Sequence, residues 1–110
     1  MTMEPLDLTK SLSDELRLRI VVLLAEHSEL CVCDLMNAVA ADQPKVSRHL
    51  AVLKKAGIVL ARRDGQWMHY RLHPDLPHWA FSVITSLHHA ASNKAPFTDD
   101  AARIRGLSCC

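Results

Sequence analysis

Two pairs of closely spaced cysteines are the residues of this 110-residue chain best suited to chemistry. Cys31 and Cys33 lie one residue apart in the stretch ELCVCDLMNAV, and Cys109 and Cys110 are the last two residues of the sequence. A Cys-x-Cys pair is too close for an ordinary structural disulfide across a loop. In a reducing compartment such thiols more often bind metal or carry out redox chemistry. Because thiolate sulfur is a soft ligand, the inner pair indicates thiophilic ions such as trivalent arsenic or antimony, Cd(II) or Pb(II).

The position of the inner pair favours ionised sulfur. Apolar residues at helical spacing predict a helix over residues 32–40, which places Cys31 and Cys33 at its first turn. Unpaired backbone N–H groups and the positive end of the helix dipole lower the pKa of a thiol at such a position. Residues i and i+2 of a regular helix diverge by about 200°, so we expect ion binding to unwind or bend this helix start. The alternative is that both cysteines are small buried apolar side chains.

Positive charge is concentrated in one part of the sequence, although the net charge of the chain is only +1. Residues 1–42 contain three basic and eight acidic residues, a net charge of −5. Residues 43–73 contain seven basic and one acidic residue, a net charge of +6, and residues 74–110 contain three of each. A solvated surface usually mixes the two signs. We therefore expect residues 43–73 to present a face that meets a polyanion.

The spacing of apolar residues predicts a mainly helical domain with one β-hairpin. Ser13 and Asp42 are plausible helix caps, and Asp64-Gly65 between two β-rich runs is the turn of the hairpin. Helices are predicted, in chain order, over residues 14–27, 32–40, 43–56, 76–91 and 98–104. A helix-turn-helix followed by a basic hairpin is the winged type of DNA-binding domain.

The predicted helix over residues 43–56 is suited to enter a DNA major groove. Glutamine pairs bidentately with adenine and arginine with guanine, whereas lysine and serine commonly reach phosphates. The first turn and a half presents Gln43, Lys45, Ser47, Arg48 and His49. We expect Ser47, Arg48 and His49 near bases and Lys45 on phosphate. The alternative is a basic surface helix that contacts only solvent.

The predicted hairpin supplies a second basic element. We expect its tip to reach a minor groove or the DNA backbone through Arg62, Arg63 and Gln66. The aromatic and apolar residues that follow alternate with polar ones, which is typical of a strand with one inward face. They are therefore expected to pack against the domain rather than to stack on nucleotides.

Three segments, ELCVCDL, QPKVSRHLAVLKKAGIV and RRDGQWMHYRL, carry a family resemblance. In their order and spacing the chain resembles the ArsR/SmtB metalloregulatory repressors, and among them those of arsenical resistance, over roughly residues 6–90. The resemblance implies a mainly α winged helix-turn-helix of order α-α-α-α-β-β-α, homodimeric through its first and last helices. It also implies a repressor that binds double-stranded operator DNA, needs no organic cofactor, and is released when As(III) or Sb(III) binds cysteine thiolates.

The chain departs from the family pattern at one ligand position. The resemblance assigns the metalloid to ELCVCDLC, but residue 36 is Met36, whose thioether is a weak substitute for a third thiolate. Two interpretations remain. Cys31 and Cys33 form a two-thiolate site completed by solvent or another ligand, or Cys109 or Cys110 completes the site from either protomer.

Several other functions compete with a metalloid-responsive repressor. A repressor of the same fold could respond to Cd(II) or Pb(II), or to oxidation of its thiols. A zinc site on the last helix is disfavoured, because the Asp-x-His and His-x-x-His or Glu patterns of zinc-sensing relatives are absent. An enzyme is also disfavoured, because the sequence has neither Cys-x-x-Cys nor a phosphate-binding loop.

The bulk sequence predicts a domain over residues 1–92, which binds DNA and dimerises, and a C-terminal tail over residues 93–110 that carries the vicinal cysteines. No window approaches 18 uncharged apolar residues. The stretch MTMEPLDLTK lacks the basic and apolar regions of a secretory signal. We therefore expect a cytoplasmic protein that does not contact a membrane.

Overall fold

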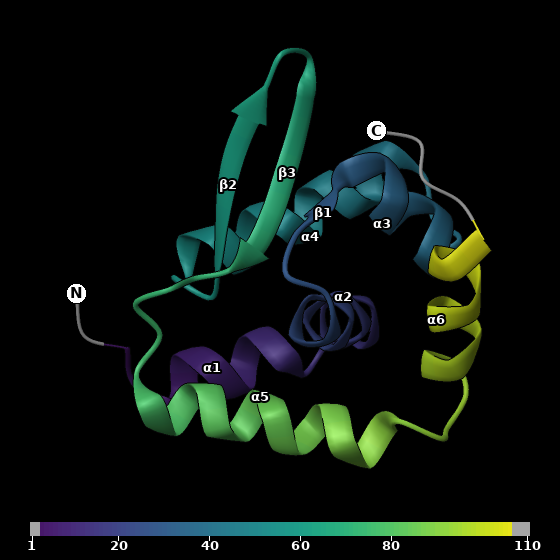
Figure 1. Ribbon diagram of the computed structural model, residues 1–110. Coiled ribbons are helices and arrows are strands. Elements are labelled where there is room, and N and C mark those ends of the chain that lie inside the picture. The colour runs from purple at the N-terminus through teal and green to yellow at the C-terminus, as the bar shows by residue number, and fades with distance from the viewer. Residues whose placement is uncertain (1–2, 107–110) are drawn as a thin grey trace.

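The structure, a computed structural model, describes residues 3–106 as a body of helices with a small three-stranded sheet at one side (Figure 1). Cys109 and Cys110 lie outside the described residues. The elements in chain order are α1 (Pro5–Leu12), α2 (Glu15–Glu26), β1 (Leu30–Cys31), α3 (Val32–Val39), α4 (Gln43–Lys55), β2 (Val59–Asp64), β3 (Trp67–Leu72), α5 (His78–Ala91) and α6 (Phe97–Gly106). The predicted winged helix-turn-helix is confirmed, with α3 and α4 as the helix pair and β2–β3 as the wing.

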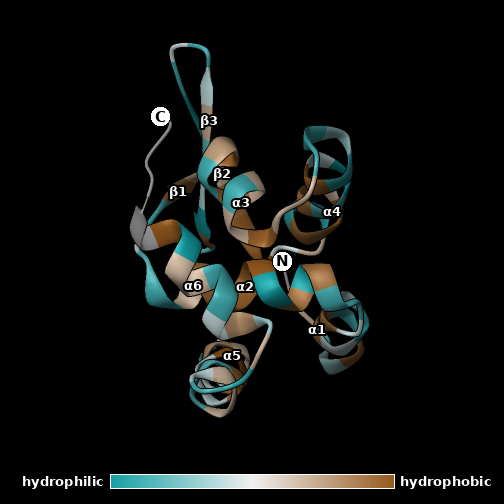
Figure 2. Ribbon diagram, turned by 90° about the vertical axis from the view of Figure 1, so that its right-hand side faces the viewer, coloured by the Kyte–Doolittle hydropathy of each residue, from teal (hydrophilic) through white to brown (hydrophobic). Residues whose placement is uncertain are grey.

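Helix α2 forms the centre of the molecule, and the other described helices pack around it. It contacts α1, α3, α4, α5, α6 and β3. Figures 1 and 2 show it enclosed by these elements. Ile20, Val21, Leu23 and Leu24 are almost completely buried, which explains why its sequence is apolar on more than one face. Among residues 3–106, no helix is long and apolar enough to cross a membrane.

The caps of the helices differ from the prediction at one place. Ser13 ends α1, and Asp14 caps α2 instead, since its carboxylate accepts the backbone N–H of Arg17 at 3.1 Å. Sequence periodicity did not locate α1, which the family order alone implied. The Asp42 cap of α4 is confirmed, with its carboxylate 3.0 Å from the backbone nitrogen of Lys45.

The turn between α3 and α4 depends on one residue of unusual conformation. Ala40 ends α3 with φ 54°, in the left-handed region, and its backbone N–H is donated to the carbonyl of Met36. The chain then needs only Ala41 and Asp42 before α4 begins. The tight turn fixes the start of α4 close to the end of α3.

The sheet joins the wing to the segment before α3. Its strand order is β1-β3-β2, all antiparallel. Leu30 pairs with Tyr70, and Cys31 pairs with His69. The wing itself turns at Gly65, whose φ of 63° favours glycine, and it projects from the body of the domain (Figure 1).

Removing the α4 cap tests how much of this geometry is local. We expect Asp42→Ala to lower the free energy of unfolding by about 1 kcal/mol, because an orphan backbone N–H of α4 loses its acceptor. Asp75→Ala, which removes another exposed aspartate, is the control. Urea unfolding measures both variants, and equal losses would contradict the capping role.

Candidate nucleic-acid interface and cysteine site

One side of α4 packs into the core and the other carries the predicted DNA-reading residues. Val46, Leu50 and Leu53 are at most 1% exposed, so they fix the rotation of the helix about its axis. The residues of the predicted reading face that are exposed are Gln43, Lys45 and Arg48. Ser47 is half-buried beside them. The helix therefore presents an amide and two cations outward together, as an interface with DNA requires.

His49 lies differently from the other predicted reading residues. Its Nδ1 is 3.1 Å from Nη1 of Arg17 and 3.9 Å from the carboxylate of Asp14, both at the start of α2. Arginine only donates hydrogen bonds, so Nδ1 accepts, and the ring is neutral with its proton on Nε2. Burial lowers the pKa of His49, an effect that the nearby Asp14 carboxylate partly offsets. The ring thus anchors α4 to α2, and its contact with bases stays a prediction.

The wing residues predicted to meet DNA are all exposed: Arg62, Arg63 and Gln66. Arg62 also has a partner within the protein. Its Nη2 and Nε lie 2.6 and 3.1 Å from the two carboxylate oxygens of Glu29, a bidentate pair. The hydrogen bond from Arg62 lowers the pKa of Glu29. His69, which follows on the neighbouring strand, is 3.8 Å from the same carboxylate.

The aromatic and apolar residues of β3 only partly follow the predicted packing. Tyr70 is half-buried against the core, and burial raises its pKa. Met68 is also half-buried, whereas Trp67, beside the turn, remains 36% exposed. The inward face of the strand is therefore confirmed near its junction with the body and is absent at Trp67.

Cys31 occupies the junction between β1 and α3. It is the N-cap of α3, with φ −82° and ψ 162°, and its sulfur accepts the backbone N–H of Asp34 at 3.5 Å. The predicted placement at the helix start is confirmed. However, Cys31 has extended backbone, so helical rotation does not separate its sulfur from that of Cys33. The expectation that the helix must unwind assumed that both cysteines lie in a regular helix, and this assumption does not hold for Cys31.

The surroundings of the inner cysteines differ from each other. Cys31 is 1% exposed, and Cys33 in the first turn of α3 is half-buried. Both are disulfide-bonded in the structure. Met36 packs against the core from the next turn. Within residues 3–106, no group of three or more His, Cys, Asp or Glu side chains is arranged to hold a metal ion.

Two contributors to the site were missed from the sequence. Glu29 was read as part of the cysteine segment, yet its carboxylate binds Arg62, 33 residues later. Arg17 was read as a residue of the scaffold helix, yet it fixes the ring of His49. Neither contact has a local signal, because both depend on how α2 and the wing pack. The single hint was the acidic balance of residues 1–42 beside the basic stretch that follows.

Comparison with known proteins agrees with this architecture. The profile described as "Bacterial regulatory protein, arsR family" matches residues 14–60. The chain is 55% identical over 80 residues to the arsenical resistance operon repressor of Escherichia coli K12, covering 73% of this chain and 68% of that protein. It is 47% identical over 103 residues to the arsenic resistance transcriptional regulator ArsR2 of Pseudomonas putida, covering 94% and 88%. The cadmium resistance regulatory protein CadC of Listeria innocua is 48% identical over 61 residues, covering 56% and 51%.

Solved structures show the same fold. HlyU from Vibrio cholerae superposes with a TM-score of 0.71 at 30% identity, covering 79% of this chain and 90% of that chain. The homodimeric winged helix-turn-helix DNA-binding domain Mb0332 from Mycobacterium bovis superposes with a TM-score of 0.66 at 28% identity, covering 79% and 77%.

The Glu29–Arg62 pair generates a prediction about DNA affinity. We expect Glu29→Gln to bind DNA several-fold more tightly at low salt, because Arg62 loses a competing carboxylate. The slope of log affinity against log salt should steepen by up to about 1 if Arg62 gains a phosphate. Glu26→Gln, an exposed glutamate of α2, makes the same change in net charge. Equal effects of the two variants in anisotropy titrations would show that only net charge matters.

His49 generates a prediction about pH. The unfolded chain takes up the histidine proton near pH 6.5, but the folded chain does so only at lower pH because burial lowers the pKa. Stability is therefore lost as the pH falls below 6.5. We expect His49→Asn, which retains an acceptor for Arg17, to lose less stability than the wild type between about pH 7.5 and about pH 5. The exposed His78→Asn should behave as the wild type in urea titrations, and a wild-type slope in His49→Asn would refute this assignment.

Proposed function

Because this chain belongs to the ArsR family of bacterial transcriptional repressors, we propose that its inducer is trivalent arsenic or antimony. In this proposal the ion binds cysteine thiolates and the protein leaves its operator. The two relatives named above for arsenic resistance support an arsenical inducer, and the relative named for cadmium resistance makes Cd(II) or Pb(II) the alternative. A cytoplasmic location stays a prediction.

One observation carries the proposal: Cys31 joins both DNA-facing elements. On one side its backbone pairs with His69 in the wing strand β3. On the other side it caps α3, which reaches α4 through the tight turn at Ala40. A ligand that moves the sulfur of Cys31 therefore pulls on the wing and on the reading helix together. Two half-sites must be met at once by a dimer, so a small displacement costs affinity.

The ligand set that we propose is centred on Cys31 and Cys33. Both sulfurs belong to the start of α3: that of Cys31 accepts the backbone N–H of Asp34 at 3.5 Å, and Cys33 lies in the first turn. A thioether at position 36 cannot supply the third thiolate, and Met36 is half-buried against the core. We assign the third thiolate to Cys109 or Cys110, which lie outside the described residues. A two-thiolate site completed by solvent is the alternative.

The DNA contacts that we propose divide between the two exposed elements. Arg48 and Ser47 are placed near base edges, with Gln43 beside them and Lys45 on phosphate. The wing adds backbone or minor-groove contacts through Arg62, Arg63 and Gln66. His49 is assigned to positioning α4, because its ring is held by Arg17.

A homodimer is part of the proposal. Large apolar side chains are exposed on α1 and α5, the first and the longest of the described helices: Leu6, Trp79, Phe81 and Val83. Their exposure is what a subunit interface would remove from water. The homodimeric state of Mb0332 supports a dimeric state for this chain.

A second candidate function is a response to thiol oxidation. The observation that favours it is that Cys31 and Cys33 are both disulfide-bonded in the structure. In this alternative, oxidation of the thiols changes the position of α3 without an ion. The two candidates share the fold, the DNA contacts and the output, and they differ only in what changes the sulfur atoms.

The decisive experiment titrates arsenite into a complex of reduced protein and a fluorescent operator fragment. We expect the wild type to release DNA and both Cys31→Ser and Cys33→Ser to stay bound, because each variant loses a thiolate. Fluorescence anisotropy measures the release. The double variant Cys109→Ser/Cys110→Ser should need a higher arsenite concentration if the tail supplies the third thiolate.

The controls separate the candidates. Cd(II), Pb(II) and oxidised glutathione are titrated in the same way. Release by Cd(II) or Pb(II) alone would contradict the arsenical inducer. Release by oxidised glutathione but by no ion would favour the redox function, and reduction with excess thiol should then restore binding.

A further inference from the structure

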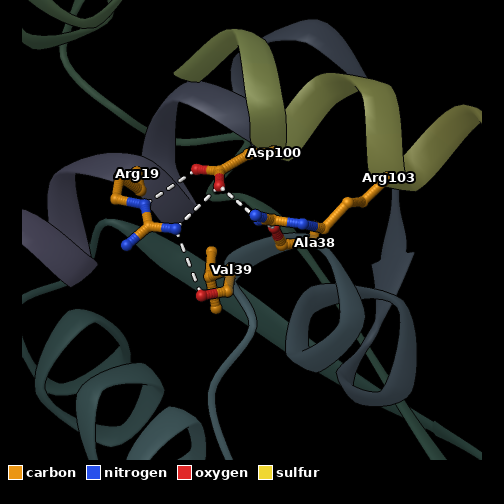
Figure 3. Close-up of polar contacts among 5 residues, drawn as sticks. All are labelled: Arg19, Ala38, Val39, Asp100 and Arg103. Atoms are coloured by element: carbon orange, nitrogen blue, oxygen red, sulfur yellow. Dashed lines mark hydrogen bonds and ion pairs between the residues drawn. The ribbon is translucent and has the colours of Figure 1, made fainter. Parts of the chain in front are cut away.

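A buried carboxylate attaches α6 to the centre of the domain (Figure 3). Asp100 is 1% exposed, and its two oxygens lie 2.7 and 2.8 Å from Nη2 and Nε of Arg19 on α2. Nη1 of Arg103, one turn later on α6, is 3.3 Å from the same carboxylate. We call these three residues the α6 clamp. Asp100 and Arg103 belong to residues 93–110, which the sequence predicts as a tail outside the DNA-binding domain.

The clamp also holds the end of α3. Nη2 of Arg19 donates to the carbonyl of Val39 at 3.1 Å, and Nη1 of Arg103 donates to the carbonyl of Ala38 at 2.7 Å. The last carbonyls of a helix lack partners within the helix, and cations are stabilising at that end. Figure 3 shows both guanidinium groups directed at this one helix end. Asp100 therefore orients two cations that together bind the last carbonyls of α3.

The end of α3 is also the start of the turn into α4. Ala40 follows Val39 with φ 54°, and Asp42 already caps α4. A connection this short restricts where the first turn of α4 can lie relative to the carbonyls that the clamp binds. That first turn carries the exposed side chains of Gln43 and Lys45, which are predicted to face DNA.

The members of the clamp differ in burial. The side chains of Arg19 and Asp100 are 14% and 1% exposed, whereas that of Arg103 is 43% exposed. Separating the partners of a buried ion pair leaves an uncompensated charge away from water, which is strongly unfavourable. Of the residues that the structure describes, no buried side-chain nitrogen or oxygen lacks a hydrogen-bond partner. Arg103 can therefore be removed while the buried Arg19–Asp100 pair stays intact.

We propose that the α6 clamp positions the helix α4 on operator DNA, so that residues of α6 set operator affinity without touching DNA. Hydrogen bonds to base edges require accurate placement of the side chains of α4, whereas attraction to phosphates does not. Loss of the clamp should therefore weaken specific binding and spare non-specific binding. Arg19, Asp100 and Arg103 are positioning residues in this inference, which rests on the proposed placement of α4 on DNA.

Asp100→Asn separates positioning from charge. The substitution removes a negative charge, so electrostatic attraction alone would tighten DNA binding. Positioning predicts the reverse, because a neutral amide cannot orient both guanidinium groups as the carboxylate does. We expect operator affinity to fall about tenfold, the size of one lost base contact, while affinity for a random duplex of equal length does not fall. Asp99→Asn, the exposed neighbour on α6 with the same change in charge, should not lose operator affinity.

Arg103→Ala keeps the inference testable if Asp100→Asn does not fold. It releases the carbonyl of Ala38 and leaves the Arg19–Asp100 pair in place. Lys94→Ala, which removes an exposed cation before α6, makes the same change in net charge. We expect Arg103→Ala to lose several-fold more operator affinity than Lys94→Ala in anisotropy titrations of reduced protein without any ion. The slope of log affinity against log salt should match the wild type, because no phosphate contact is lost.

Amide hydrogen exchange in the absence of DNA tests the cause of the loss. The N–H of Ala41 in the turn is donated to the carbonyl of Met36 at 3.2 Å, and that of Ile58, beyond the far end of α4, to the carbonyl of Leu53 at 3.0 Å. Exchange at Ala41 should accelerate in both clamp variants, and exchange at Ile58 should stay as in the wild type. Equal acceleration at both sites would show a general loss of stability and would overturn the positioning role.

Different results contradict the clamp and the placement of α4 on DNA. A wild-type ratio of operator to random-duplex affinity in Arg103→Ala and in folded Asp100→Asn overturns the positioning role. Tighter operator binding by Asp100→Asn overturns it as well, because charge alone then explains the result. If Arg48→Ala binds the operator as the wild type does, the proposed placement of α4 on DNA is wrong instead, and exchange at Ala41 still decides whether the clamp holds the turn.

Discussion

The antiparallel pairing of β1 with β3 is the constraint on which the rest of the structure depends. A strand of only two residues places Cys31 opposite His69, and so attaches the cysteine segment to the wing by backbone hydrogen bonds. At the same residue the chain turns into α3, with the sulfur as its cap. Had β1 been a free loop, the sulfur could move without consequence for either DNA-facing element. In the proposed function, coupling follows from continuity of the backbone, and by linkage any effect of an ion on DNA affinity must be reciprocal.

The two arginine–carboxylate pairs of the domain differ in what they allow. Arg62 and Glu29 are 53% and 27% exposed, so water competes for both charges and the pair contributes little to stability. Arg62 can therefore exchange its carboxylate for a phosphate at small cost. Asp100 is 1% exposed and Arg19 14%, and removing one partner there costs about 3 kcal/mol. The exposed pair can separate at little cost in stability, whereas the buried pair holds its two helices together.

The buried pair lies at the opposite end of α3 from the proposed thiol site. Cys31 caps the N-terminus of this helix, and the guanidinium groups of Arg19 and Arg103 occupy its C-terminus. Helix α3 has only eight residues, so its two ends lie within about 12 Å of each other. The left-handed conformation of Ala40 then leads within two residues into α4. Each end of α3 is thus held by a side chain from outside the helix: the sulfur of Cys31 at the N-terminus and two guanidinium groups at the C-terminus.

The sequence by itself determined most of the elements and their order, because these depend on local patterns, but it located neither α1 nor the two-residue strand β1. Apolar spacing located α2 to α5, Asp64-Gly65 located the wing turn, and Asp42 located the start of α4. The cap of α2 was misplaced by one residue, because Ser13 and Asp14 are both good caps and the choice depends on where α1 ends.

Only the tertiary structure decided which polar residues meet across the fold. His49 and Arg48 are adjacent in one helix, yet packing against α2 turns the first inward and leaves the second exposed. Glu29 with Arg62, and Arg19 with Asp100, are 33 and 81 residues apart, and no pattern in the sequence pairs them. Any arginine attracts any carboxylate, so the packing of the apolar core decides which of them come into contact. That packing is a property of the whole chain, which local patterns do not contain.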